Sequence, residues 1–205
     1  MLWKFRAEAA YAAAFALITV SAAKGWTASA DLAVADWCAQ HQQIVIEWIA
    51  IVLNKLGQGW LVMVLLSGGL TAWLLYKTRK LIVAAPMALA FALTYFTTGP
   101  LKLWSERDAP SSTLPNRVEF FNDAAAYSLS YPSGHVVNAI VWWGVIEILL
   151  NRQLTWLRIA APAIVLCTTT YLGHHWLTDG LGALTLGLLL DRIIHRVKWD
   201  AVLPR

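Results

Sequence analysis

Residues 168–180, which read TTTYLGHHWLTDG, contain the pair of side chains best suited to nucleophilic chemistry. His175 and Asp179 are four residues apart, so on a helical turn they share one face. The carboxylate can then accept a hydrogen bond from one ring nitrogen, which makes the other nitrogen a better nucleophile. His174 is five residues from Asp179 and is expected to point elsewhere. The spacing therefore predicts His175 as a nucleophile that Asp179 orients.

A second polar corner, YPSGH at residues 131–135, precedes a long apolar run. Proline and glycine allow a tight turn there, and the N–H groups at the start of the following helix can hold an anionic oxygen. We expect Ser133 and Gly134 to take part in that anion site. His135 falls in the first helical turn, where it is available as a general acid.

A third patch, residues 98–112, contains two cations. Lys102 and Arg107 can neutralise a phosphate, and arginine offers two parallel donors to it. Asn116 and Arg117, a few residues further on, are candidates for additional substrate contacts. A lone ionisable residue near a membrane is usually a snorkelling or internally paired side chain. Three patches at the same depth are better explained by one site for nucleophilic attack on phosphorus.

Metal binding is the competing use of the histidines and the aspartate. Two cations and a serine corner would crowd a divalent ion, and no third close carboxylate or cysteine follows the histidines. We therefore expect neither a metal nor a cofactor. Trp104 and Trp176 flank the predicted site and could contact a lipid tail or headgroup, although an interfacial aromatic belt also explains them.

The composition is that of a membrane protein. Of the 205 residues, 59% are hydrophobic and 14% are charged, and the mean hydropathy is +0.56, which is too apolar for an ordinary soluble domain. The sixteen lysines and arginines are scattered between apolar runs, so the net charge of +4 does not indicate nucleic-acid binding. We expect one polytopic domain over residues 1–205, surrounded by membrane lipids, and nothing in the sequence points to a protein partner.

The apolar runs predict an all-α bundle of six transmembrane helices. A seventh run, residues 44–56, is short and carries polar residues, so it predicts an interfacial helix before the second span. The first run reads better as a retained span than as a cleaved signal peptide, because the rest of the chain is equally apolar. The six predicted spans cover residues 7–23, 60–76, 81–98, 136–150, 157–172 and 177–194.

Loop charges predict the orientation. With a cytoplasmic N-terminus, eleven cations lie on the inner side and four on the outer side. Both termini are then cytoplasmic, and the predicted site opens on the extracytoplasmic face of the plasma membrane. The inner cations are Lys4, Arg6, Lys77, Arg79, Lys80, Arg152, Arg158, Arg192, Arg196, Lys198 and Arg205, and the outer ones are Lys24, Lys102, Arg107 and Arg117.

From Lys102 to Asp179 the sequence resembles the type 2 phosphatidic acid phosphatase superfamily, whose membrane members have six spans and three motifs, K-x6-R-P, P-S-G-H and S-R-x5-H-x3-D. The second motif is complete at residues 132–135, and the H-x3-D of the third is present as His175 and Asp179. The resemblance implies that His175 forms a phosphohistidine, that Asp179 orients it and that His135 protonates the leaving group.

Two cations of these motifs are missing. The arginine position of the first motif holds Ala109, and the serine and arginine of the third hold Thr168 and Thr169. We expect Arg107 to replace one of the two arginines, with Arg117 or Asn116 supplying further contacts. The stretches RDAP and YLGHHW are also similar to the inositol phosphorylceramide synthase branch, which transfers a lipid-linked phosphoryl group to an alcohol.

The sequence thus predicts a metal-independent membrane phosphatase that hydrolyses a lipid phosphate or pyrophosphate, of isoprenoid, glycerolipid or similar type. The first alternative is a phosphotransferase that passes the group to an alcohol such as inositol. An alternative of another class is a transporter-like bundle that uses its histidines for proton or anion passage. Inverted-repeat symmetry would favour the transporter, and inspection of the sequence reveals none.

Overall fold

The computed structural model describes residues 5–122 and 129–203, and every regular element in these ranges is a helix. The predicted all-α class is therefore confirmed, and each predicted apolar run is helical. Lys4 and Arg205, counted above as inner cations, lie outside the described residues. The elements are α1 (Arg6–Ala23), α2 (Ala28–Gln40), α3 (Ile44–Asn54), a 3-10 turn (Lys55–Gly57), a π-helical segment (Trp60–Gly68) that continues into α4 (Gly69–Thr78), a 3-10 turn (Leu81–Ala84) that continues into α5 (Ala85–Ser105), α6 (Gly134–Leu150), α7 (Thr155–Tyr171), α8 (Leu177–Ile194) and α9 (Trp199–Val202).

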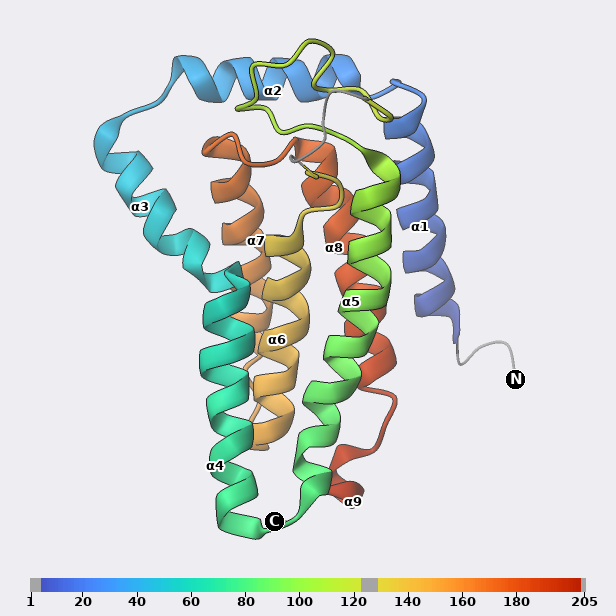
Figure 1. Cartoon of the computed structure of the whole chain (residues 1–205), viewed down its shortest axis with the longest axis vertical. Coiled ribbons are helices and arrows are strands. Elements are labelled where there is room, and N and C mark those ends of the chain that lie inside the picture. Colours follow the sequence, from blue (N-terminus) through green and yellow to red (C-terminus); the bar gives the residue numbers. More distant parts are fainter. Residues whose placement is uncertain (1–4, 123–128, 204–205) are drawn as a thin grey trace.

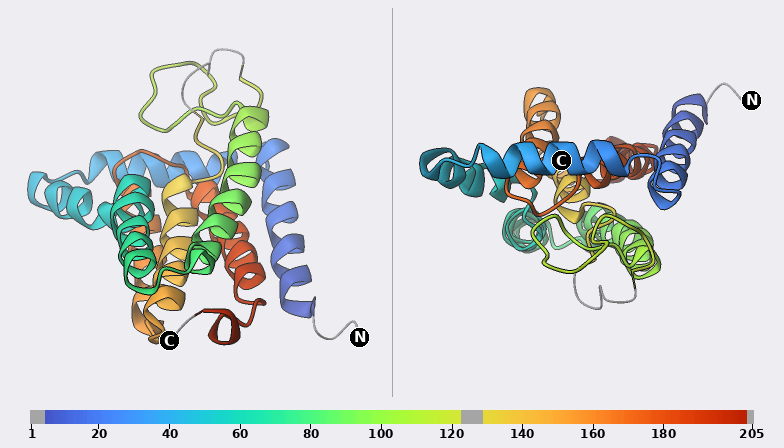
Figure 2. Two further views of the ribbon diagram at one scale, coloured as in Figure 1. Left: turned by 60° about the horizontal axis from the view of Figure 1, so that its bottom comes forward. Right: turned by 90° about the horizontal axis from the view of Figure 1, so that it is seen from above.

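Most of the helices run along one long axis, with α6 among α4, α5, α7 and α8 (Figure 1). α3 runs obliquely to this direction, and α2 crosses it (Figure 1). α2 is bent by 83° from α1 and lies across the ends of α7 and α8, as the view from above in Figure 2 shows. The N-terminal end of α1 and the whole of α9 lie away from α2 (Figure 1). One end of the bundle is thus covered by a crossing helix.

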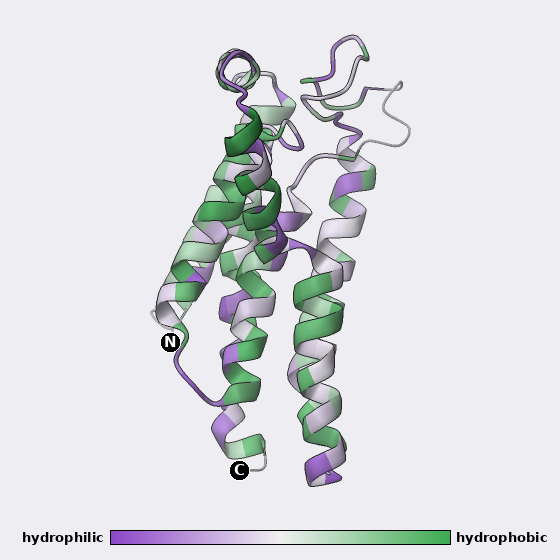
Figure 3. Ribbon diagram, turned by 90° about the vertical axis from the view of Figure 1, so that its left-hand side faces the viewer, coloured by the Kyte–Doolittle hydropathy of each residue, from purple (hydrophilic) through white to green (hydrophobic). Residues whose placement is uncertain are grey.

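Hydrophobic residues make up much of the helical ribbon, whereas many hydrophilic ones lie in the loops and near helix ends (Figure 3). In the described part of the chain two helices, Trp60–Thr78 and Leu81–Ser105, are long and apolar enough to cross a membrane. The bent pair α1 and α2 would add a third if it counts as one span, and α6 is a shorter apolar helix. The number of six spans therefore stays a prediction.

The hydrophobic core is built around α6. Because this helix is apolar on all sides, it is stable only when other helices surround it. Val137, Val141 and Trp142 are fully buried on it, and α8 packs closely alongside. At Gly187 of α8 an added Cβ would come within 2.7 Å of Ile140 Cδ1, so the close approach of the two helices needs a residue without a side chain. This packing fixes the end of α6 that carries the P-S-G-H corner.

The sequence analysis does not predict α2 or the short α9. For α2 the reason is its composition. Its apolar content is too low for a span, and the charged residues at positions 31 and 36 favour a loop on hydropathy alone. In the structure Asp31 and Cys38, seven residues apart, are buried on the face that meets the bundle. The segment predicted to be interfacial does form a helix, α3, with exposed apolar side chains; its depth in a membrane stays a prediction.

Gly57 offers a test of how the turn before α4 packs on α6. A Cβ there would lie 2.3 Å from the carbonyl oxygen of His135, a backbone atom that cannot move aside easily. At Gly69 an added Cβ has no neighbour within 4 Å. We expect Gly57→Ala to destabilise the protein by about 1–3 kcal/mol, and Gly69→Ala to be neutral or slightly stabilising, because alanine favours helix. Thermal unfolding in detergent checks this, and equal midpoints for the two variants would contradict it.

Candidate active site

The three polar patches meet at the end of the bundle that α2 covers. The ring of His135 lies 5.8 Å from that of His175 and 6.3 Å from that of His174, measured between centroids. The backbone N–H of Ser133 donates to the carbonyl of Asp179 at 3.2 Å, which joins the start of α6 to the start of α8. Segments far apart in the sequence therefore bring their histidines together.

His175 is buried and faces the carboxylate of Asp179. Its Nδ1 lies 3.7 Å from Asp179 Oδ2, which is an ion-pair separation but is longer than a hydrogen bond. Burial lowers the pKa of His175, and the neighbouring Asp179 carboxylate opposes this shift without reversing it. The imidazole is therefore neutral near pH 7, which is its nucleophilic form. Since Nδ1 faces the carboxylate, Nε2 is the nitrogen on the opposite edge of the ring.

His135 has a partner that the sequence did not suggest. Its Nε2 lies 3.2 Å from Oε1 of Gln58, in the break between the 3-10 turn and the π-helical segment. Both side chains are half-buried. The sequence does mark this position, because Gln58 stands between two glycines that interrupt an apolar run. Nothing in that run, however, indicates which residue Gln58 faces.

Lys102 and the start of α6 form a cationic corner. The ammonium of Lys102 donates to the carbonyls of Leu129 and Ser130, and its Cε lies 3.7 Å from the position of an added Cβ on Gly134. Ser133 is buried and caps α6, since its Oγ accepts from the N–H of Val136 at 3.5 Å. A cation beside a helix N-terminus favours a bound anion.

Arg107 departs from the expected role. It is 1% exposed, and Nη1 donates to Asp179 Oδ1 at 2.6 Å while Nη2 donates to Asp31 Oδ2 at 2.6 Å. Nη1 also reaches the hydroxyl of Thr178, and Nε donates to the carbonyl of Val118. All three nitrogens are directed into the protein, so a direct contact between Arg107 and phosphate does not fit this geometry.

Trp176 is likewise a structural residue here rather than a surface for substrate. Its indole is 1% exposed and donates to the carbonyl of Asp108 at 2.7 Å. The ring lies 5.5 Å from the guanidinium carbon of Arg107, and the backbone N–H of Trp176 donates to Asp179 at 2.9 Å. The predicted substrate contact of Trp176 is therefore inconsistent with its burial.

The other predicted substrate contacts lie on α5 and in the segment after it. Trp104 is half exposed and packs edge-on against Phe120 and Phe121. Arg117 donates to the carbonyl of Ser112 at 2.7 Å, and Asn116 is exposed. Substrate contacts by these three residues stay predictions.

The positions of the missing motif cations are neutral in the structure as well. Thr169 is buried in α7 and donates to the carbonyl of Val165, and the N–H of Ala109 is 2.9 Å from the carboxylate of Asp108. Over residues 5–122 and 129–203 no group of three or more His, Cys, Asp or Glu side chains is arranged to hold a metal ion. Independence of a metal is still a prediction.

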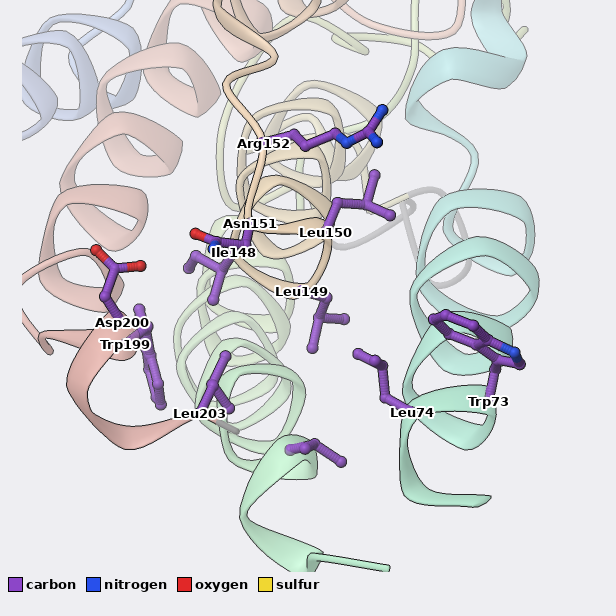
Figure 4. A pocket seen from close by; sticks show the side chains of 11 residues that line it. Trp73, Leu74, Ile148, Leu149, Leu150, Asn151, Arg152, Trp199, Asp200 and Leu203 are labelled. Carbon is purple, nitrogen blue, oxygen red and sulfur yellow. The ribbon is translucent and has the colours of Figure 1, made fainter. Parts of the chain in front are cut away.

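A cavity of about 510 Å³ lies at the other end of the bundle, between α4, α6 and α9. Figure 4 shows that its lining is mainly aliphatic and aromatic, including Leu74, Leu149 and Trp199, with Arg152 and Asp200 among its polar members. It contains no histidine. Of the two regions, the histidine cluster beneath α2 is the one equipped for phosphoryl chemistry.

Known proteins resemble this chain in both sequence and fold. The sequence model of the PAP2 superfamily matches residues 83–203. Phosphatidylglycerophosphatase B of Bacillus subtilis (strain 168) is 35% identical over 114 residues, which are 51% of this chain and 52% of that protein, so the match spans about half of the relative's length. The crystal structure of a transmembrane PAP2-type phosphatidylglycerolphosphate phosphatase from Bacillus subtilis superposes with a TM-score of 0.71 at 23% identity, covering 95% of this chain and 98% of that one.

The two arginines near the site should differ in their effect on stability. Arg107→Met would leave two buried carboxylates without their shared cation, and breaking such a pair costs about 3–5 kcal/mol. Arg117→Met removes one contact in a loop, for which about 0.5 kcal/mol or less is expected. Thermal unfolding of both variants in the same detergent measures the difference. A stability of Arg107→Met close to that of Arg117→Met would show that the buried ion cluster is not formed.

Proposed function

Because the chain belongs to the PAP2 superfamily, we propose that it is a phosphatase that hydrolyses a lipid phosphate or pyrophosphate. Its apolar helices and its fold, shared with a transmembrane PAP2-type enzyme, make it a membrane protein. The observation that carries the proposal is the buried His175, which faces Asp179 on one side and lies 5.8 Å from the ring of His135. The relative named phosphatidylglycerophosphatase B supports a lipid phosphate as the substrate class.

In the first step Nε2 of His175 attacks phosphorus, and the bond from phosphorus to the leaving oxygen breaks. His135 donates a proton to that oxygen, so the lipid product departs as an alcohol or, from a pyrophosphate, as a protonated phosphate. Lys102 and the N–H groups at the start of α6 hold the phosphoryl oxygens. Asp179 stabilises the positive charge that develops on the imidazole.

In the second step water attacks the phosphohistidine. His135, neutral after the first step, accepts a proton from the water, and the bond between phosphorus and His175 breaks. Inorganic phosphate leaves and both histidines return to their starting states. Gln58, as the partner of His135 Nε2, supports the orientation of this ring through both steps.

For the membrane arrangement we propose six spans, formed by α1, the π-helical segment with α4, α5, α6, α7 and α8, with α3 as an interfacial helix before the second span. The excess of lysine and arginine in the loops away from α2 supports cytoplasmic termini and an extracytoplasmic site at the plasma membrane. This site would be accessible to lipids of the outer leaflet.

Phosphotransfer to an alcohol is the second candidate. It is favoured by the neutral residues Ala109 and Thr169 at the positions where hydrolytic relatives are expected to carry arginine. Both reactions share the first step, and they differ only in whether water or an alcohol takes the phosphoryl group. A transporter-like bundle would not need the proton-donor and nucleophile pair formed by His135 and His175.

Substitution of the two adjacent histidines should have very different effects on activity. His175→Ala removes the nucleophile and should lower phosphate release by at least about a thousandfold, with loss of the acid-labile phosphoenzyme. His174→Ala should retain activity within about fivefold, because its exposed ring does not face Asp179. Rapid acid quench with labelled lipid phosphate measures both quantities. Equal losses in the two variants would refute the assignment of the nucleophile.

Purified protein in detergent or lipid nanodiscs should release inorganic phosphate from at least one member of a panel of lipid phosphates, without any added alcohol or metal. The panel should contain isoprenoid, glycerolipid and sphingolipid phosphates, with the His175→Ala variant as the control for contaminating phosphatases. The same assay with labelled donor lipid and inositol tests the alternative. Formation of an alcohol-dependent phosphodiester with negligible phosphate release would establish transfer instead of hydrolysis.

A further inference from the structure

The ion cluster of Asp31, Arg107 and Asp179 connects the crossing helix α2 to the carboxylate that faces His175. Arg107 binds one oxygen of each carboxylate at 2.6 Å, and all three side chains are at most 1% exposed. From this arrangement we propose that Asp31 is a positioning residue, which acts through Arg107 to hold and to tune Asp179. The proposal rests on the phosphatase mechanism above, in which Asp179 supports His175.

The cluster fixes the carboxylate of Asp179 from both sides. One oxygen accepts from Arg107, and the other accepts from the N–H of Trp176 and faces His175. Asp31 in turn accepts from the backbone N–H of Thr178 at 3.0 Å and from its hydroxyl. Since Thr178 is the residue before Asp179, α2 holds both the guanidinium and the backbone next to the carboxylate.

The charge balance gives Asp31 an effect on Asp179 beyond its effect on geometry. One guanidinium is shared by two carboxylates, so the buried cluster keeps a net charge of about −1 near His175. A cation paired with Asp179 alone would neutralise that carboxylate more completely. The negative charge of Asp31 therefore leaves Asp179 better able to stabilise the positive imidazole that forms when His175 attacks phosphorus.

The chain makes this contact through two local features. Glu106 adopts a left-handed backbone conformation, with φ of 44°, at the end of α5, and this turns the chain so that Arg107 enters the interior. The rings of Phe120 and Trp176 then lie 5.2 and 5.5 Å from the guanidinium carbon. Asp31 lies outside residues 83–203, the part that matches the superfamily, so this chain supplies the contact from its N-terminal region.

The test compares Asp31→Asn with Asp191→Asn. Asp191 is a matched control, since it is a buried carboxylate on α8 that pairs with Arg158, three turns away from Asp179 and at the other end of the bundle. We expect Asp31→Asn to lower kcat roughly ten- to a hundredfold, by analogy with the loss of residues that hydrogen-bond to metal ligands, with KM for the lipid phosphate within about twofold. Asp191→Asn should keep kcat within about twofold at a comparable loss of thermal stability.

A purely structural role for Asp31 predicts a different pattern, in which both variants lose stability and neither loses kcat, and this result would overturn the proposal. Thr178→Val provides a second variant if Asp31→Asn does not fold, because it removes the hydroxyl contacts to Asp31 and Arg107 and keeps every charge. Its kcat should fall about threefold or more at unchanged KM, and an unchanged kcat would overturn the proposal as well.

The wild-type assay separates this inference from the function on which it rests. If wild-type protein releases phosphate and Asp31→Asn behaves like Asp191→Asn, the positioning role is wrong and the phosphatase stands. If wild-type protein releases no phosphate from any lipid of the panel, the proposed function fails and the positioning role fails with it.

Discussion

A guanidinium buried between two carboxylates is the constraint on which this end of the molecule depends. Burying three charges is unfavourable unless each is paired and hydrogen-bonded, and Arg107, Asp31 and Asp179 meet that condition only if α2, the end of α5 and the start of α8 come together in one arrangement. The crossing direction of α2 follows from it. The arrangement also brings the His175 turn beneath α2, so the same interaction that orders the fold orients the candidate nucleophile.

Much of the fold could be predicted because its signals are local. The apolar runs at residues 136–150 and 177–194 end at polar corners, and α6 and α8 begin and end within two residues of those bounds. The spacing of four residues also predicted that His175 and Asp179 lie close together. In the structure His175 lies in the turn before α8 rather than on the helix, and its Nδ1 is 3.7 Å from Asp179 Oδ2. The count of six spans stays a prediction, because in the described residues only Trp60–Thr78 and Leu81–Ser105 are single helices long and apolar enough to cross a membrane, and α6 has 17 residues.

What the sequence could not supply is the pairing between distant segments. Arg107 and Asp31 are 76 residues apart, and a cation near a predicted phosphate site gives no local sign of whether it faces ligand or protein. Asp31, Val34, Ala35 and Cys38 recur at helical spacing, but this does not predict a buried helix, because a charged residue on that face counts against burial until its partner is known. The contacts of Gln58 and Trp176 cannot be predicted for the same reason. They depend on His135 and Asp108, which lie on other helices or loops.

The two ends of α8 show what distinguishes a chemical cluster from a structural one. At the far end Arg158 also bridges two carboxylates, Glu147 and Asp191, and His195 lies four residues from Asp191, as His175 does from Asp179. The pairing rules are therefore alike, and pairing alone does not make a catalytic site. The two clusters differ in burial, since Arg158 is 26% exposed and Arg107 is 1% exposed. They also differ in the second histidine, His135, whose ring lies 5.8 Å from that of His175. Low exposure strengthens each charge interaction, and in the proposed mechanism His135 supplies the acid that the attack of His175 on a substrate phosphoryl group requires.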